Sequence, residues 1–411
     1  MREMKDSGIP WIGEIPKEWQ VNMLSSLFDE HKQKNKDLAE TNLLSLSYGK
    51  IVRKDINTKE GLLPESFDGY NVISKGDIVF RLTDLQNDKR SLRTGLCLEK
   101  GIITSAYVTI RERAPLNSSY FHYLLHSYDL CKVFYGMGDG VRQGMNYSDL
   151  RKLLVLQPSL AEQQRIAEFL DRKCAEVDEM IGLQEQIIEE LKAYKQSVIT
   201  EAVTKGLNPD APMRDSGIEW IGQIPAHWEV KRLKFIAERH NQKVSDEVLP
   251  YIGLENVESF SERFIETENE YDITQAQVCA VGDVIFGKLR PYLGKAMVIK
   301  TEHCCSSEFL VLSGSGAPSY LRYLMLSDWF VEIVNASTYG TKMPRANADY
   351  IMNMQVVCPS IEERKAIADY LDEKCADIDS LIQTKLSKID SLKEYKKSII
   401  YEYVTGKREV E

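Results

Sequence analysis

The chain has 411 residues, too many for one ordinary hydrophobic core, so we expect at least two domains. Hydrophobic residues make up 43% and charged residues 28%, no stretch approaches the roughly 20 apolar residues of a membrane span, and the polar start MREMKDSGIP lacks the apolar core of a signal peptide. These features predict a soluble, cytoplasmic protein. The net charge of −10 disfavours a surface that is basic overall, so any surface for nucleic acid must be a local patch.

The first recognisable element along the chain is a tryptophan-bearing phrase that occurs twice. Residues 6–21 read DSGIPWIGEIPKEWQV and residues 215–230 read DSGIEWIGQIPAHWEV, with eleven of the sixteen positions identical. We expect the apolar residues of each copy to form a clip that pins the start of one half against the far end of the other half's long helix, or against a partner seated there. The residues of this tryptophan clip are Trp11, Ile12, Ile15 and Trp19, with their twins Trp220, Ile221, Ile224 and Trp228.

Each phrase is followed by a variable stretch of about 135 residues and then by a second repeated segment. SLAEQQRIAEFLDRKCAEVD (159–178) matches SIEERKAIADYLDEKCADID (360–379) at an offset of 201 residues. Between the repeats the halves diverge, with a faint echo where Gly76-Asp77 resembles Gly282-Asp283. A period this long indicates duplication of a whole domain rather than a solenoid of short repeats.

The second repeated segment predicts a long helix in each half. Pro158-Ser159 and Pro359-Ser360, each followed by a glutamate three residues after the serine, are typical of a capped helix start. The apolar stripe could face an ordinary core, but a helix of roughly 65 Å is buried most economically against an equal helix, and the duplication makes such a pair antiparallel. The seam residues, at spacings of three and four, are Ile166, Leu170, Val177, Ile181, Ile188 and Leu191, and their counterparts Ile367, Leu371, Ile378, Ile382, Ile389 and Leu392.

The predicted fold class is therefore α+β. Two globular mixed α/β heads are separated by a long antiparallel two-helix coiled coil, and the whole is a pseudo-twofold tandem repeat. The predicted regions are head one with its phrase (1–158), the first long helix (159–206), head two (207–359) and the second long helix (360–411).

The sequence contains no recognisable catalytic constellation. There is no Gly-x-x-x-x-Gly-Lys-Ser/Thr phosphate loop, GMGDGVRQG (136–144) does not match Gly-x-Gly-x-x-Gly, and the signature of adenine methyltransferases is missing. The eight cysteines form no C-x-x-C pair, so we expect reduced thiols and no metal site. We also expect that no histidine recurs in both halves. These observations predict a protein that is not an enzyme.

The repeated motifs resemble those of the specificity subunit of Type I restriction-modification enzymes. DSGIxWIGxIPxxWxV stands before each variable head, and SxxExxxIAx[FY]LDxKCAx[VI]D leads into LKxYKxS[VI]IxExVT after it, so the resemblance spans essentially the whole chain. It implies a subunit without catalytic activity, whose two target recognition domains each read one half of a bipartite, asymmetric DNA target.

The resemblance also implies partners and cofactors. Two modification subunits, which methylate adenine at N6 and bind S-adenosylmethionine, would dock on the helical rod. Two restriction subunits, motor-nucleases that use ATP and Mg, would join them. This chain itself would hold no cofactor and no metal.

Base-contacting candidates are polar and cationic residues in loop-like stretches of the two heads. Arginine is the geometric favourite for guanine and asparagine or glutamine for adenine, although any one of these residues could equally be an ordinary solvated side chain. Head one offers Arg81, Gln86, Asn87, Lys89, Arg90, Arg93, Arg142, Gln143 and Asn146. Head two offers Lys288, Arg290, Lys295, Lys342, Arg345 and Asn347.

Two other functions remain open from the sequence. The chain could be a structural adaptor that dimerises through its rod and binds protein through its heads. It could also be a methyltransferase itself, in which case the isolated chain would bind S-adenosylmethionine.

Overall fold

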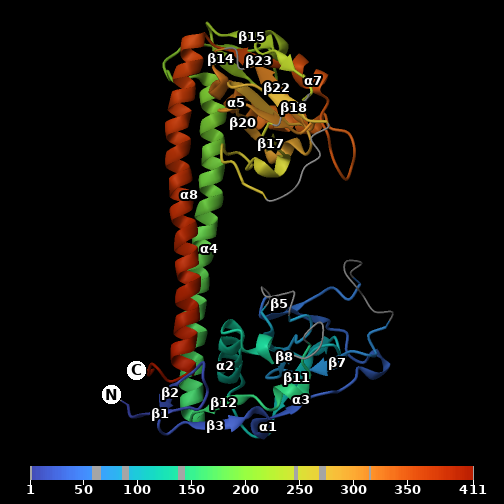
Figure 1. Ribbon diagram of the computed structural model, residues 1–411, viewed down its shortest axis with the longest axis vertical. Coiled ribbons are helices and arrows are strands. Elements are labelled where there is room, and N and C mark those ends of the chain that lie inside the picture. Colours follow the sequence, from blue (N-terminus) through green and yellow to red (C-terminus); the bar gives the residue numbers. More distant parts are fainter. Residues whose placement is uncertain are drawn as a thin grey trace. The chain divides into compact units, whose positions relative to one another are not determined.

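The computed structural model describes residues 2–57, 66–85, 92–137, 144–244, 249–267, 275–313 and 316–410. The chain forms two compact units (Figure 1). Unit 1 comprises Met1–Leu183 and Lys388–Glu411, and unit 2 comprises Gln184–Ser387. Two long helices, α4 (Leu160–Lys205) and α8 (Ile361–Val404), each contribute one part to each unit.

Head one, in unit 1, is built on a four-stranded antiparallel sheet of order β4-β11-β8-β9. These strands are β4 (Phe28–Glu30), β11 (Val108–Glu112), β8 (Ile78–Phe80) and β9 (Thr94–Leu96). Four antiparallel pairs surround the sheet or extend it: β1 (Met4–Asp6) with β2 (Glu14–Pro16), β3 (Gln20–Met23) with β12 (Leu154–Gln157), β5 (Leu44–Ser47) with β6 (Lys50–Arg53), and β7 (Asn71–Ile73) with β10 (Gly101–Ile103). The helices are α1 (Leu24–Leu27), α2 (Ser118–Leu130) and α3 (Tyr147–Leu150), with 3-10 turns η1 (Lys36–Leu38) and η2 (Val133–Gly136).

Head two, in unit 2, repeats this sheet strand for strand in the order β16-β22-β19-β20. These strands are β16 (Arg239–His240), β22 (Phe309–Ser313), β19 (Asp283–Gly287) and β20 (Ala296–Val298). The phrase and flanking strands repeat as β13 (Met213–Asp215) with β14 (Gln223–Pro225), and β15 (Glu229–Arg232) with β23 (Gln355–Cys358). The outer strands differ, because β17 (Tyr251–Ile252) runs parallel to β21 (His303–Cys305), which pairs with β18 (Gln277–Cys279). The helices are α5 (Pro318–Leu326), α6 (Asp328–Ala336) and α7 (Ala348–Asn353), with η3 (Leu233–Phe235), η4 (Leu254–Asn256) and η5 (Pro291–Leu293).

The Gly-Asp echo seen in the sequence is a turn that starts the central strand of each sheet. Gly76 and Gly282 have positive φ angles of 97° and 87°, which glycine adopts at little cost. The following carboxylates close the turn, since Asp77 accepts from the backbone N–H of Ser74 at 2.7 Å and Asp283 from that of Ala280 at 2.9 Å. The echo is therefore structural, and it sets where each central strand begins.

Side chains of the central strands alternate between two apolar layers, as the period of two in a strand requires. In head one, Ile78 and Phe80 pack with α2, whereas Val79 packs with Ile73 on the outer strands. Figure 1 shows α2 beside β8 and β11. In head two, the residues of β19 divide in the same way between α5 and the outer strands. Each sheet is thus covered on both faces.

The long helices pack antiparallel within each unit. In unit 1 the Nζ of Lys396 lies 2.6 Å from a carboxylate oxygen of Asp178, and the rings of Phe169 and Tyr403 are 4.4 Å apart. In unit 2 Lys195 makes the same contact with Asp379 at 2.7 Å. An offset of 201 residues converts one ion pair into the other, so the two units repeat the same helix contact.

Most of the predicted seam is buried. Ile181 and Leu191 are half-buried, and the other ten seam residues are buried. The α+β fold class, with paired long helices and a tandem repeat, is confirmed by these contacts and by solved structures that share the fold.

We predict that Leu371→Ala lowers the free energy of unfolding of the full chain by about 2–5 kcal/mol, because it leaves a cavity where the side chain is fully buried. Leu381→Ala, the same change on the same helix at a residue that is 50% exposed, should change it by about 0.5 kcal/mol or less. Urea denaturation followed by circular dichroism measures both. Equal changes in the free energy of unfolding for the two substitutions would contradict the burial of Leu371 in the seam.

Candidate nucleic-acid interface

The structure brings together the two candidate segments of head two. Leu289 and Arg345 form a β-bridge, the backbone N–H of Arg290 donates to the carbonyl of Pro344 at 2.7 Å, and that of Ala346 donates to the carbonyl of Lys288 at 2.9 Å. Segments 287–293 and 339–347 therefore lie side by side at the end of β19. We call the cationic residues gathered here the cationic edge of head two: Arg239, Lys288, Arg290, Lys342 and Arg345.

Several cations of this region are already engaged within the protein. Arg345 pairs with Glu308, and Arg239 lies 3.0 Å from the carboxylate of Asp349. Lys288 is half-buried, and burial together with the nearby positive charges of Arg239 and Arg345 lowers its pKa. Arg290 and Lys342 are exposed like these two arginines, but among the described residues their side chains have no hydrogen-bond or ion-pair partner.

Lys295 lies near the cationic edge but is used inside the head. Its Nζ donates to the carbonyl oxygen of Leu254 at 2.6 Å, and burial lowers its pKa. We therefore assign Lys295 a structural role in holding the η4 turn against β20.

The two candidate asparagines are helix caps. The side-chain oxygen of Asn347 accepts from the backbone N–H of Asp349 at 2.7 Å, at the start of α7. Asn146 accepts from the N–H of Ser148 at 2.7 Å at the start of α3 and forms a capping box with Asp149. Both are exposed, but their oxygens serve the helix, which is the commonest role of asparagine at such a position.

Arg93 corrects the expectation for head one, because its side chain is completely buried. Its guanidinium donates to the carbonyls of Thr83 at 2.9 Å and Asp84 at 3.3 Å, and it lies over the ring of Tyr135. It holds a loop together from inside and presents no donor on the surface. The sequence could not indicate this, because backbone carbonyls, which every residue carries, are among the partners of Arg93.

The remaining candidates of head one have mixed positions. Arg81 is half-buried on the strand side of the same loop. Gln86, Asn87, Lys89, Arg90, Arg142 and Gln143 lie outside the described residues.

The contact that joins the two segments of head two has a counterpart in head one. The backbone N–H of Met145 donates to the carbonyl of Leu82 at 2.9 Å, as that of Ala346 donates to the carbonyl of Lys288 in head two. The same two segments thus meet in both heads.

A lysine-rich concave surface of head one was missed by the sequence prediction. Four lysines border a cavity of about 600 Å³ next to η1: Lys32, Lys34, Lys36 and Lys100. Three of the four, all but Lys36, contact oxygen atoms of their own head, at Glu30, Gly69 and Glu40. The run HKQKNK (31–36) was the signal that could have found this surface.

The expectation that no histidine recurs is wrong. HKQK (31–34) and HNQK (240–243) occupy equivalent places: the carbonyl of Gln33 accepts from Val72 N–H at 2.7 Å, and that of Gln242 from Val278 N–H at 2.8 Å. The histidine contacts differ, since His31 lies 3.1 Å from a backbone carbonyl and His240 lies 3.3 Å from the carboxylate of Asp283. The twin is structural, and among the described residues no group of acidic, histidine and cysteine side chains has the arrangement of a metal site.

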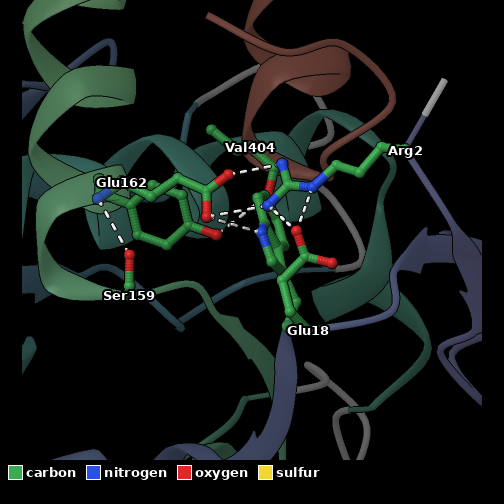
Figure 2. Close-up of polar contacts among 7 residues, drawn as sticks. Arg2, Glu18, Ser159, Glu162 and Val404 are labelled. Carbon is green, nitrogen blue, oxygen red and sulfur yellow. Dashed lines mark hydrogen bonds and ion pairs between the residues drawn. The ribbon is translucent and has the colours of Figure 1, made fainter.

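The tryptophan clip joins each phrase to a capped helix start. The indole N–H of Trp19 donates to a carboxylate oxygen of Glu162 at 3.0 Å, and that of Trp228 donates to Glu363 at the same distance. Each glutamate is the third residue after the serine that caps its helix. Figure 2 shows Glu162 held in addition by Arg2, which also contacts Glu18.

The clip also lies against the end of the other long helix, as the sequence predicted. Trp19 packs on Gly406, just beyond the end of α8, where a Cβ would lie 3.1 Å from the ring. Trp228 packs on Gly206, just beyond the end of α4, with a corresponding distance of 3.0 Å. Of the two locations expected for the clip, the structure shows the end of the other long helix.

One tryptophan of the clip does not follow the prediction. Trp11 is half-buried, with its ring 5.7 Å from that of Tyr128 and its carbonyl accepting from the hydroxyl of Tyr401 at 2.9 Å. Its twin Trp220 is 46% exposed. The residues that correspond to the two tyrosines in the other half are Asp328 and Thr200, which offer no ring, so the second copy of the clip rests on Ile221, Ile224 and Trp228.

Comparisons with known proteins support the class that these features define, a two-headed α+β repeat with paired long helices. Residues 16–193 match the family model described as the Type I restriction modification DNA specificity domain. The chain is 25% identical to the Type I restriction enzyme MjaVIII specificity subunit of Methanocaldococcus jannaschii over 75% of each chain. It is 23% identical to the EcoDI specificity subunit of Escherichia coli over 59% of this chain and 60% of that protein.

Solved structures show the same fold. A chain from a study of the assembly and conformational transition of the type I R-M system gives a TM-score of 0.69 at 16% identity, covering 96% of this chain and 99% of that one. The HsdS subunit from Thermoanaerobacter tengcongensis gives 0.51 at 16% identity, covering 96% and 98%.

Residues 16–193 therefore match the model of the Type I restriction modification DNA specificity domain, and the resemblance of the whole chain to specificity subunits is confirmed. The prediction of a non-catalytic component is confirmed by this relationship. In the described part of the chain no helix is long and apolar enough to cross a membrane.

We predict that Glu363→Gln weakens the fold most at neutral pH. Burial raises the pKa of Glu363, but hydrogen bonds from Trp228, His227 and Ser360 outweigh it and lower this pKa from 4.5 to about 2. A carboxyl whose folded pKa is lowered stabilises the fold above pH 4.5, and this stabilisation is lost as the pH falls towards 2.

The thermal midpoint of Glu363→Gln should thus lie below that of the parent at pH 7, and the difference should narrow as the pH falls from 4.5 to 2. Glu362→Gln, at the exposed neighbouring residue, is the matched control and should follow the parent. A difference that does not depend on pH would contradict the assigned role of the carboxylate.

Proposed function

We propose that the chain is the DNA sequence-specificity subunit of a Type I restriction-modification system. It binds a bipartite, asymmetric duplex target, and each head reads one half-site. The observation that carries this proposal is the repeated frame of the heads. The same two segments meet at the end of the same central strand in both, through Met145 and Leu82 in head one and through Ala346 and Lys288 in head two.

The side chains on this shared frame differ between the heads. Head two presents the cationic edge, whereas head one presents the lysine-rich surface near η1 and the loop that Arg93 supports from inside. Two copies of one backbone arrangement with different side chains suit a protein that reads two different sequences. Contacts to phosphates position such a protein on the duplex, whereas side-chain contacts to base edges determine which sequence is bound. This supports an asymmetric target.

The repeated clip and helix contacts supply the argument for partners. The Lys396–Asp178 and Lys195–Asp379 pairs make the two helix regions alike, and like surfaces bind like partners. We propose that two modification subunits, each an adenine-N6 methyltransferase carrying S-adenosylmethionine, bind to the helical regions. Two restriction subunits that use ATP and Mg join the complex. The chain itself carries no cofactor in this scheme, and the complex acts in the cytoplasm.

The test is selection of duplexes from a randomised pool by the full chain together with its modification subunit. A bipartite sequence with two conserved parts, bound with an affinity that falls as salt rises, is the expected result. Binding without sequence preference would contradict the proposal and favour the structural adaptor. Binding of S-adenosylmethionine by the isolated chain would favour the methyltransferase alternative.

We predict that replacing residues 22–157 with the corresponding head of another family member changes one half-site and leaves the other unchanged. The reason is that head one has its own sheet and apolar layers. The selected sequence of the hybrid, obtained from the same duplex pool, measures this. Replacement of residues 231–358 is the reciprocal control and should alter only the other half-site. A hybrid in which both half-sites change would show that the heads do not read independently.

A further inference from the structure

Arg290 stands in a backbone conformation that is unusual for arginine. Its φ and ψ angles of 51° and 60° are left-handed, a region that residues other than glycine, asparagine and aspartate seldom occupy. The residue is also followed by Pro291, which restricts it further. Such a conformation persists only where the surroundings fix it, and it is concentrated at functional sites.

Three backbone contacts fix Arg290. Its N–H donates to the carbonyl of Pro344 at 2.7 Å, its own carbonyl accepts from Leu293 N–H at 3.0 Å, and the preceding residue forms the β-bridge with Arg345. The turn that carries Arg290 is therefore held from within by η5 and from the side by the neighbouring segment.

The other end of this turn is anchored to the long helices of the same unit. Gly294 has a φ of 54° and lies against Phe260, whose ring would be 2.5 Å from a Cβ at this position. The N–H of Phe260 donates to the carbonyl of Gly294 at 2.9 Å. The carbonyl of Phe260 in turn accepts from the Nζ of Lys195 at 3.2 Å, and Lys195 is paired with Asp379. A continuous set of contacts thus runs from α4 and α8 to the Arg290 turn.

Arg290 is nevertheless an exposed residue. Among the described residues its guanidinium has no hydrogen-bond or ion-pair partner, whereas Arg345 and Arg239 are paired with carboxylates. Lys342 is exposed too, but it lies in the loop between Tyr339 and Arg345, and its backbone is not in the left-handed region. Arg345 is also exposed and has its backbone bridged to Leu289 and Tyr339, but its guanidinium is paired with Glu308. Of the five residues of the cationic edge, Arg290 is the one that combines a left-handed backbone held on both sides with a side chain left unpaired among the described residues.

We propose that Arg290 is the specificity-determining residue of the cationic edge and donates two hydrogen bonds to O6 and N7 of a guanine in one half-site. This inference rests on the proposed function. A guanidinium offers donors in a rigid fork that matches guanine, and a fixed backbone keeps that fork in one position. A phosphate contact needs no such fixed geometry, and it suits Lys342 and the paired arginines instead.

The test uses the full chain with its modification subunit and the randomised duplex pool, comparing the parent with Arg290→Lys and Arg290→Gln. Arg290→Lys keeps the charge but loses the fork, so preference for guanine at one position of one half-site should fall by about five- to 150-fold. Arg290→Gln should shift that position towards adenine, which glutamine contacts with two hydrogen bonds. The other half-site, read by head one, is the internal control and should not change.

Lys342→Ala is the matched control on the same edge. It should weaken binding to all sequences alike and reduce the dependence on salt, as loss of a phosphate contact does. If the parent itself selects no sequence, the proposed function fails. If the parent selects a bipartite sequence and Arg290→Lys keeps every base preference, or loses preference equally in both half-sites, the assignment of Arg290 alone is overturned.

Discussion

The hydrogen bond from a buried tryptophan to the capping glutamate of a long helix is the contact on which each half depends. Trp19 and Trp228 are almost fully buried, and a buried indole N–H needs an acceptor. Glu162 and Glu363 provide it at the first turn of the helix, where a negative charge is also favoured by the helix dipole. The same rings rest on the glycines that end the other long helix. One side chain therefore ties together a helix start, a helix end and the strand that leads into the head.

This arrangement explains why the phrase and the helices repeat closely while the heads diverge. The clip needs a ring of one shape, a carboxylate at one position and a glycine with a positive φ, so few residue types fit. Inside the heads, different residues solve the same local problem. Arg93 and Lys295 occupy corresponding positions in the two sheets, because the carbonyl of Arg93 accepts from the N–H of Arg81 and that of Lys295 accepts from the N–H of Gly287. The cationic side chain of each residue donates to a backbone carbonyl of a nearby loop or turn. Divergence there leaves the frame intact.

Much of the fold could be predicted because it depends on local patterns. Spacings of three and four, the Pro-Ser-x-x-Glu starts and the offset of 201 residues are visible in the sequence and do not require knowledge of distant contacts. The burial of Arg93 and the exposure of Trp220 were not visible, because they depend on the carbonyls of Thr83 and Asp84 and on the absence of rings at two distant positions. The HxQK twin was missed because the residues on either side of it have diverged.

The candidate site was predicted less completely, because residue type alone does not distinguish a cation that contacts a ligand from one that supports a loop. The two segments chosen in head two lie side by side, which the sequence did not predict, and Lys295 and the capping asparagines are used by the protein itself. What separates Arg290 from them is its fixed backbone, which depends on the carbonyl of Pro344, more than fifty residues away. Such a contact leaves no mark on the local sequence.

The acidic balance of the chain is consistent with a protein that discriminates between sequences. A net charge of −10 means that the chain as a whole does not attract DNA electrostatically. The cationic edge has five cations against the carboxylates of Glu308 and Asp349, which leaves a local excess of positive charge. Those two carboxylates hold Arg345 and Arg239 in place and reduce their attraction for phosphate. A surface of this kind gains little from phosphates alone, so the proposed DNA binding depends more heavily on correctly placed base contacts, and this raises the ratio of specific to non-specific affinity.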